Sequence, residues 1–135
     1  MRASGLRVEP VVLKLGGSVI TYKNKPRKAN EEAINRLSKE IAQAEIPQLV
    51  IVHGGGSFGH PLAKKYALKE GFNGKASQLL GFSETHQAMV TLNKLVVDAL
   101  IQRNIPAIAV SPSSCVVTKS GRITTVIEEP LNQIL

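Results

Sequence analysis

Apolar runs and amphipathic segments alternate along the first part of the chain. Residues 8–15 are almost continuously apolar up to Lys14, and residues 48–52 form a second apolar run. Runs of this kind predict strands that are buried on both faces, as in a parallel sheet. Between them, Asn30 is a suitable N-cap for an amphipathic helix with apolar side chains at Ile34, Leu37, Ile41 and Ala44. The order strand, helix, strand predicts an α/β fold.

The second part of the chain predicts two more helices and a third strand. Residues 61–69 form a short helix that ends at Gly71, and residues 106–110 form the strand. Residues 81–103 form a long helix. Its apolar stripe consists of Phe82, Met89, Leu92, Val96 and Leu100, and further apolar side chains beside it indicate either a thick core or a subunit contact: Val90, Val97 and Ile101.

The end of the chain predicts a β-hairpin and the start of a helix. Residues 115–118 and 123–126 are two β-prone runs that flank a turn containing Gly121. Residues 127–135 begin a helix that has no C-terminal cap signal, so we expect the domain to continue beyond them. The predicted fold class is an open, mainly parallel sheet in an α/β/α sandwich, with a small β-hairpin.

Each of the first two predicted strands runs into glycines. Gly16-Gly17-Ser18 follows the first strand, and Gly54-Gly55-Gly56 follows the second. Open α/β sheets bind ligands at the carboxyl ends of their strands, where glycines let backbone N–H groups converge on an anion and a helix dipole adds positive potential. A tight turn with no ligand is the alternative. His60, one helical turn beyond the glycines, favours a phosphate site.

The charge of the chain agrees with a small phosphorylated ligand. Seventeen Lys and Arg residues against ten acids give a net charge of +7. Residues 21–28 form a lysine-rich segment that we expect to be a mobile loop. The basic residues are scattered and aromatic residues make up only 4% of the chain, which argues against nucleic acid as the partner.

Composition narrows the class of protein further. A chain of 135 residues with 43% apolar content is sufficient for one globular domain. No run approaches the roughly 18 apolar residues of a membrane span, and the N-terminus lacks an apolar signal segment, so the sequence predicts a cytoplasmic protein with no membrane partner. Cys115 is the single cysteine and is expected to be buried. No pair of carboxylates has the spacing of metal ligands, so no metal site is predicted.

Two motifs resemble those of a known family. Lys14-Leu15-Gly16-Gly17-Ser18 has no Walker A spacing, and the glycines from Gly54 to Gly59 do not match a dinucleotide-binding fingerprint. Together, however, K-x-G-G-S after the first strand and H-G-G-G after the second resemble the amino acid kinase family. The resemblance runs from about Val11 to the end of the chain, and it is strongest to members that phosphorylate isopentenyl phosphate to isopentenyl diphosphate.

The resemblance implies roles for individual residues. It implies ATP and Mg²⁺ as cofactors and a small phosphorylated isoprenoid as substrate. Its catalytic residues would be Lys14, at the end of a buried strand, Lys23 in the basic loop and His60 on the acceptor phosphate. The nucleotide's phosphates would be held by Lys14, Gly16, Gly17, Ser18 and Gly56, and the acceptor by Gly54, Gly55, Ser57, His60 and Phe82. His86 is assigned to core packing rather than to the acceptor pocket.

The chemistry needs no general base, because the acceptor is already a phosphate oxygen. Phosphoryl transfer depends on positioning and charge compensation, which lysines and backbone N–H groups supply. His60 would therefore orient and neutralise the acceptor rather than abstract a proton.

Length is where the sequence departs from the family, whose members are roughly twice as long. The resemblance therefore implies that residues 1–135 are the N-terminal, acceptor-binding part, without the nucleotide-binding part and inactive alone. The sheet edge left uncovered by the missing part favours association, so we expect a homodimer or a larger species. Two alternatives stay open: a kinase for another small phosphate or phosphonate, and a non-catalytic module for anion binding or dimerisation.

Overall fold

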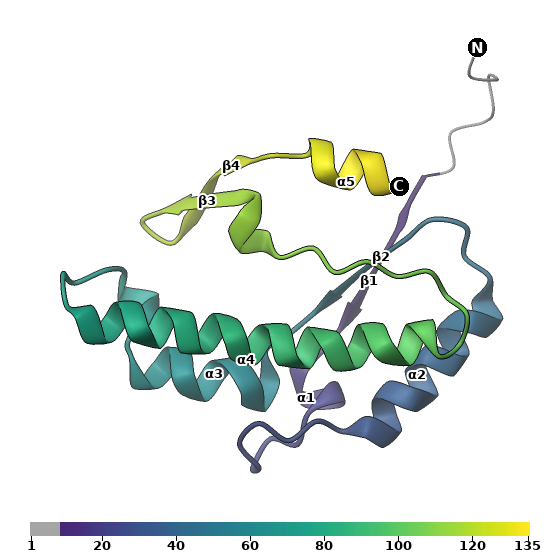
Figure 1. Ribbon diagram of the computed structural model, residues 1–135, viewed down its shortest axis with the longest axis horizontal. Helices are drawn as coiled ribbons and strands as arrows, with labels where there is room; N and C mark the ends of the chain where they lie inside the picture. The colour runs from purple at the N-terminus through teal and green to yellow at the C-terminus, as the bar shows by residue number, and fades with distance from the viewer. Residues whose placement is uncertain (1–8) are drawn as a thin grey trace.

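The computed structural model describes residues 9–135, so the predicted start of the first strand at residue 8 lies outside the described residues. Strands β1 (Val11–Leu15) and β2 (Leu49–His53) form a parallel pair whose register runs from Val11 opposite Leu49 to Leu15 opposite His53. Helix α2 (Glu31–Ala44) is the crossover between them (Figure 1). This confirms the predicted α/β unit.

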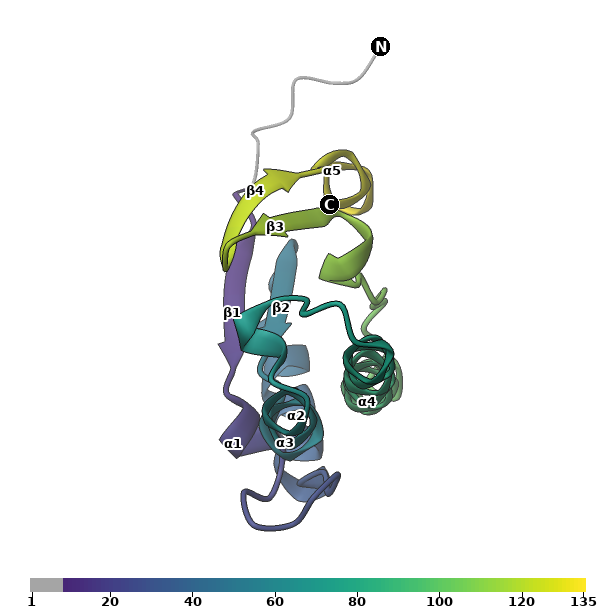
Figure 2. The same ribbon diagram turned by 90° about the vertical axis from the view of Figure 1, so that its left-hand side faces the viewer.

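The described residues cover only one of the two faces of the parallel sheet. Leu15 is buried, and Leu13 and Ile51 pack against the same core. On the other face Val12 is 66% exposed and Val52 is 48% exposed. Figure 2 shows α4 (Ala76–Ile101) on one side of the two strands. The prediction that both faces are buried is therefore wrong for residues 9–135.

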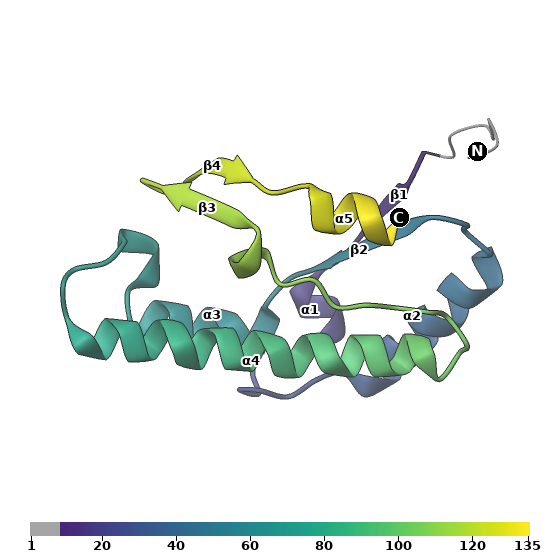
Figure 3. The ribbon, with the colours of Figure 1, turned by 45° about the horizontal axis from the view of Figure 1, so that its top comes forward.

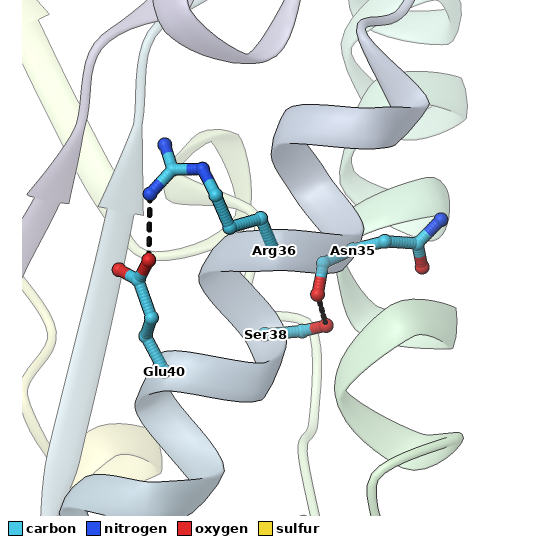
Figure 4. Close-up of polar contacts among 4 residues, drawn as sticks. All are labelled: Asn35, Arg36, Ser38 and Glu40. Carbon is cyan, nitrogen blue, oxygen red and sulfur yellow. Dashed lines mark hydrogen bonds and ion pairs between the residues drawn. The ribbon is translucent and has the colours of Figure 1, made fainter.

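Helix α2 has the predicted N-cap. Asn30 Oδ1 accepts a hydrogen bond from Ala33 N at 3.1 Å, and the helix ends at Glu45 in the left-handed conformation. Ser38 is buried but satisfied, because its hydroxyl donates to the Asn35 carbonyl at 2.9 Å (Figure 4). The Arg36–Glu40 ion pair in the same view is exposed and contributes about 0.3–0.5 kcal/mol.

Helix α3 (Gly56–Lys65) begins at the glycines rather than at Pro61, which lies inside it. Proline has no N–H, so Pro61 cannot donate to the Ser57 carbonyl one turn earlier. Arg27 N, in the basic loop, donates to that carbonyl at 3.0 Å instead. The helix also ends earlier than predicted, and a short 3₁₀ turn, η1 (Leu68–Glu70), precedes Gly71. A contact from another segment thus makes an interior proline tolerable.

Helix α4 begins at Ala76, earlier than predicted, and runs beside α3 (Figure 3). Leu92, Val96 and Leu100 are buried as expected, whereas Phe82 is 58% exposed and does not belong to the buried stripe. The buried Gln78 closes the connection between the two helices. Its amide nitrogen lies 2.9–3.3 Å from the carbonyls of Tyr66, Ala67 and Gly71, and its amide oxygen accepts from Asn73 N at 2.7 Å.

The segment after α4 contains no third strand. Residues 106–110 form a coil between α4 and the 3₁₀ turn η2 (Pro112–Ser114), as Figure 1 shows. Ile108 in this coil is 71% exposed. A strand requires a neighbour for its backbone groups, and the described strands pair only as β1 with β2 and β3 with β4. The prediction of a strand over residues 106–110 is therefore wrong.

The C-terminal hairpin is confirmed. Strands β3 (Val116–Lys119) and β4 (Arg122–Val126) are antiparallel, and Ser120 and Gly121 between them both have positive φ, as a type I′ turn requires. Cys115, before the hairpin, is buried as predicted, and α5 (Glu129–Ile134) follows it. None of the described helices is both long and apolar enough to cross a membrane.

We predict that Gly81→Ala destabilises the protein. An added Cβ would overlap the Tyr66 side chain, including the Tyr66 Cβ at 2.5 Å, so α3 and α4 would have to separate. Overpacking of this kind costs about 1–3 kcal/mol. Urea unfolding followed by circular dichroism measures the loss. Ser83→Ala, on the exposed side of the same helix, is the control and should change the free energy of unfolding by less than about 0.5 kcal/mol.

Candidate anion-binding site

The two glycine turns contact each other through their backbones. Helix α1 (Gly17–Ile20) follows Gly16 at the end of β1. A Cβ atom at Gly17 would overlap the Gly56 nitrogen and would lie 2.8 Å from the Gly56 Cα. A Cβ atom at Gly54 would lie 2.8 Å from the Gly17 nitrogen. Real Cβ atoms do not approach so closely, so this contact requires glycine on both sides.

Thr21 fastens the same contact from the side. Its hydroxyl donates to the Gly17 carbonyl at 2.7 Å and accepts from Ser57 N at 3.0 Å, and the residue is 1% exposed. Gly56 has a φ of +47°, and a Cβ there would overlap the Thr21 hydroxyl. Thr21 is therefore not part of a mobile loop, as the sequence predicts, but a buried bridge between the two turns. The available signal is its spacing from Gly17, one helical turn, which allows the hydroxyl to bond back to that carbonyl.

The remaining glycines fall into two groups. Gly55 and Gly59 face α4, because Cβ atoms there would lie 3.0 and 2.8 Å from the Met89 sulfur. Gly16 has room for a side chain: the nearest atom to a Cβ there is Val19 Cγ2 at 3.6 Å, and its φ of −63° is ordinary. Packing therefore explains glycine at the other positions of the two turns but not at Gly16.

Several backbone donors of the two turns have no acceptor within the described part of the chain. The N–H groups of Gly16, Gly55 and Gly56 take part in no hydrogen bond that joins two described residues. Gly56 also opens α3, so the positive end of that helix adds to these donors. His60 lies one turn further along α3, on the same side as Gly56, and is exposed. This combination can bind an anion.

The other predicted site residues differ in how far the structure buries them. Ser57 is buried, its N–H bonds to Thr21 and its hydroxyl to the Lys28 carbonyl at 3.4 Å, so its polar groups are used within the fold. Ser18 and Lys23 are exposed, on α1 and in the basic loop. Lys14 is exposed too, which corrects the expectation that it is buried; it shares the uncovered face of the sheet with Val12.

His86 is not a plain core residue. It is half-buried, and its Nε2 lies 3.4 Å from the Ser111 hydroxyl at the start of η2. Further along α3, away from the glycines, the pKa of Lys65 is raised, chiefly by the neighbouring Tyr66 side chain and also by the Glu84 carboxylate. Lys65 is therefore a cation at neutral pH at the C-terminal end of α3, where positive charge is favourable.

Fold and site together define the class of protein. The chain belongs to the amino acid kinase family, whose model matches residues 9–135. The relatives that it matches carry a more particular name. It is 38% identical over 136 residues to the isopentenyl phosphate kinase of Methanocaldococcus jannaschii, with 92% of this chain and 52% of that protein covered. It is 28% identical over 141 residues to the isopentenyl phosphate kinase of Arabidopsis thaliana, with 77% and 42% covered.

Solved structures give the same result. An X-ray structure of isopentenyl phosphate kinase matches with a TM-score of 0.86 and 36% identity, over 94% of this chain and 54% of that one. The product complex of the Thermoplasma acidophilum enzyme matches with a TM-score of 0.74 and 37% identity, over 90% and 49%. The chain thus spans about half the length of the relatives it matches.

We predict that Gly17→Ala and Gly16→Ala, at adjacent positions, differ sharply in stability. The first places a Cβ against the Gly54 and Gly56 backbone, which cannot swing aside, so a loss of about 1–3 kcal/mol or more is expected. The second makes only ordinary contacts and should stay within about 0.5 kcal/mol of the parent. Chemical denaturation of both variants tests this, and equal losses would contradict the backbone contact described above.

Proposed function

We propose that this chain forms the acceptor-binding part of an ATP-dependent kinase whose acceptor is isopentenyl phosphate. One observation supports this most strongly. The N–H groups of Gly55 and Gly56 are left without acceptors inside the described chain, at the start of a helix that carries His60 one turn later. The names of the similar proteins indicate the acceptor's chemical class, and the exposed ring of Phe82 on α4 is available for an apolar tail.

The reaction proposed is the transfer of one phosphoryl group. The bond between the terminal phosphorus of ATP and its bridging oxygen breaks, and a bond forms from that phosphorus to an oxygen of the acceptor phosphate. The products are isopentenyl diphosphate and ADP. The site's own groups would act by charge: the Gly55 N–H and His60 on the acceptor, and Lys14, Lys23 and the Gly16, Gly17 and Gly56 N–H groups on the phosphates of ATP.

The proposal gives no role to a metal ion. Among residues 9–135, no three His, Cys, Asp or Glu side chains lie together as metal ligands would, so we assign no step to Mg²⁺. The division of labour between an acceptor-binding part and a nucleotide-binding part stays a prediction, as do the homodimer and the cytoplasmic location.

The test is a set of titrations of the 135-residue chain. Isothermal calorimetry with isopentenyl phosphate, inorganic phosphate and ATP should show isopentenyl phosphate binding most tightly, because only it offers both a phosphate and an apolar tail. A coupled assay should show no steady phosphoryl transfer. Equal affinity for inorganic and isopentenyl phosphate would contradict the isoprenoid acceptor, and no binding of either would overturn the anion site.

We predict that His60→Ala weakens the binding of isopentenyl phosphate about tenfold to a hundredfold. The imidazole would make a charge-assisted hydrogen bond to the phosphate, which contributes about 1.5–3 kcal/mol. Lys64→Ala removes an exposed cation one turn further along the same helix and serves as the control, with an expected change below about threefold. If both variants lose the same affinity, His60 contributes only to the general positive field.

A further inference from the structure

His53, the last residue of β2, makes two hydrogen bonds that the proposed chemistry does not use. Its Nδ1 lies 3.1 Å from the Gly54 carbonyl oxygen, and its Nε2 lies 3.0 Å from the side-chain nitrogen of Asn93 on α4. Both side chains are half-buried. The chain of contacts therefore runs from the long helix, through the imidazole, to the first peptide of the glycine turn.

The two contacts together select one tautomer of the neutral ring. The amide nitrogen of Asn93 can only donate, so Nε2 must accept. The proton of the neutral imidazole is then on Nδ1, which donates to the Gly54 carbonyl. The assignment rests on the network of partners, because hydrogen atoms are placed by what surrounds them.

The bond to the Gly54 carbonyl also determines where the Gly55 N–H points. In a planar trans peptide the C=O and the N–H point in opposite directions. Fixing the Gly54 oxygen toward His53 therefore turns the Gly55 N–H away from it, and no described residue accepts from that N–H. Glycine on both sides of this peptide leaves its rotation sterically cheap, so the backbone alone does not hold this orientation.

Helix α4 supports the same turn at a second point. Met89 lies one turn before Asn93, and its sulfur packs against Gly55 and Gly59. Cβ atoms added at these two glycines would lie 3.0 and 2.8 Å from the sulfur. Met89 limits where the turn can move, but a thioether makes no strong hydrogen bond and does not select between the two orientations of the peptide. The imidazole of His53 does.

We propose that His53 is a positioning residue which Asn93 holds with its proton on Nδ1, so that the Gly54–Gly55 peptide keeps its N–H directed at a bound phosphate. The phosphate itself rests on the function proposed above. The orientation of the peptide and the position of the proton do not depend on the proposed function, because both are properties of the ligand-free protein.

A pair of amide substitutions separates this role from simple packing. Both His53→Asn and His53→Gln replace the ring by a flexible amide. In asparagine the amide nitrogen can occupy the place of Nδ1, attached to Cγ, and donate to the Gly54 carbonyl, whereas in glutamine it lies near the place of Nε2. A role in packing alone would treat the two amides alike.

The experiment measures affinity and orientation in the 135-residue chain. Calorimetry with isopentenyl phosphate should give His53→Asn within about threefold of the parent and His53→Gln about three- to tenfold weaker than His53→Asn, the range of one neutral hydrogen bond. Thr91→Val, on the exposed side of α4, is the control and should bind as the parent does. Nitrogen-15 NMR should place the His53 proton on Nδ1, and Asn93→Leu should give a mixture of tautomers.

The outcomes distinguish this proposal from the proposed function. If the parent binds neither isopentenyl phosphate nor inorganic phosphate, the proposed function is wrong. The NMR spectra of the ligand-free protein then test the positioning role of His53 on their own. A Gly55 amide resonance that moves in His53→Gln but not in His53→Asn then supports it. A proton on Nε2 in the parent, or the same change in both variants, overturns the role of His53.

Discussion

The close approach of two backbone turns is the constraint on which the rest of the site depends. The parallel register sets Leu15 opposite His53, so the turns after β1 and β2 leave the sheet at the same level. They meet at Gly17, Gly54 and Gly56, where no side chain could fit, and Thr21 holds them together. The N–H groups of Gly16 and Gly56 lie beside this backbone contact, so the contact rather than flexible side chains sets their spacing. Such preorganised donors are what binding of a charged group requires.

Local signals account for the parts of the fold that the sequence predicts correctly. The Asn30 cap, the turn at Ser120 and Gly121 and the alternation of apolar runs each act within a few residues, and each is present in the structure. The glycine turns at one edge of the sheet follow from the parallel order of the strands. The glycines that the sequence places in the site therefore lie directly after the two predicted strands, whereas Lys23 lies in the basic loop and Phe82 within α4.

The incorrect predictions concern features that depend on distant partners. Glycines and a proline usually interrupt a helix, yet α3 runs through both, because Thr21, Arg27 and Met89 provide contacts from three other segments. Residues 106–110 have the composition of a strand but no neighbouring strand among the described residues. The link between His53 and Asn93 joins two elements that are far apart in sequence, so no periodicity within either element could reveal it.

The bond between Arg27 N and the Ser57 carbonyl has a consequence for the basic loop. It is made by backbone atoms on both sides, and it exists because Pro61 leaves that carbonyl free. A second backbone bond, from Tyr22 N to the Lys28 carbonyl, closes the loop at its base. The path of the loop is thus set independently of its side chains. Substitutions of the charged side chains along residues 22–28 can therefore change the attraction of this loop for anions while the backbone path of the loop stays the same.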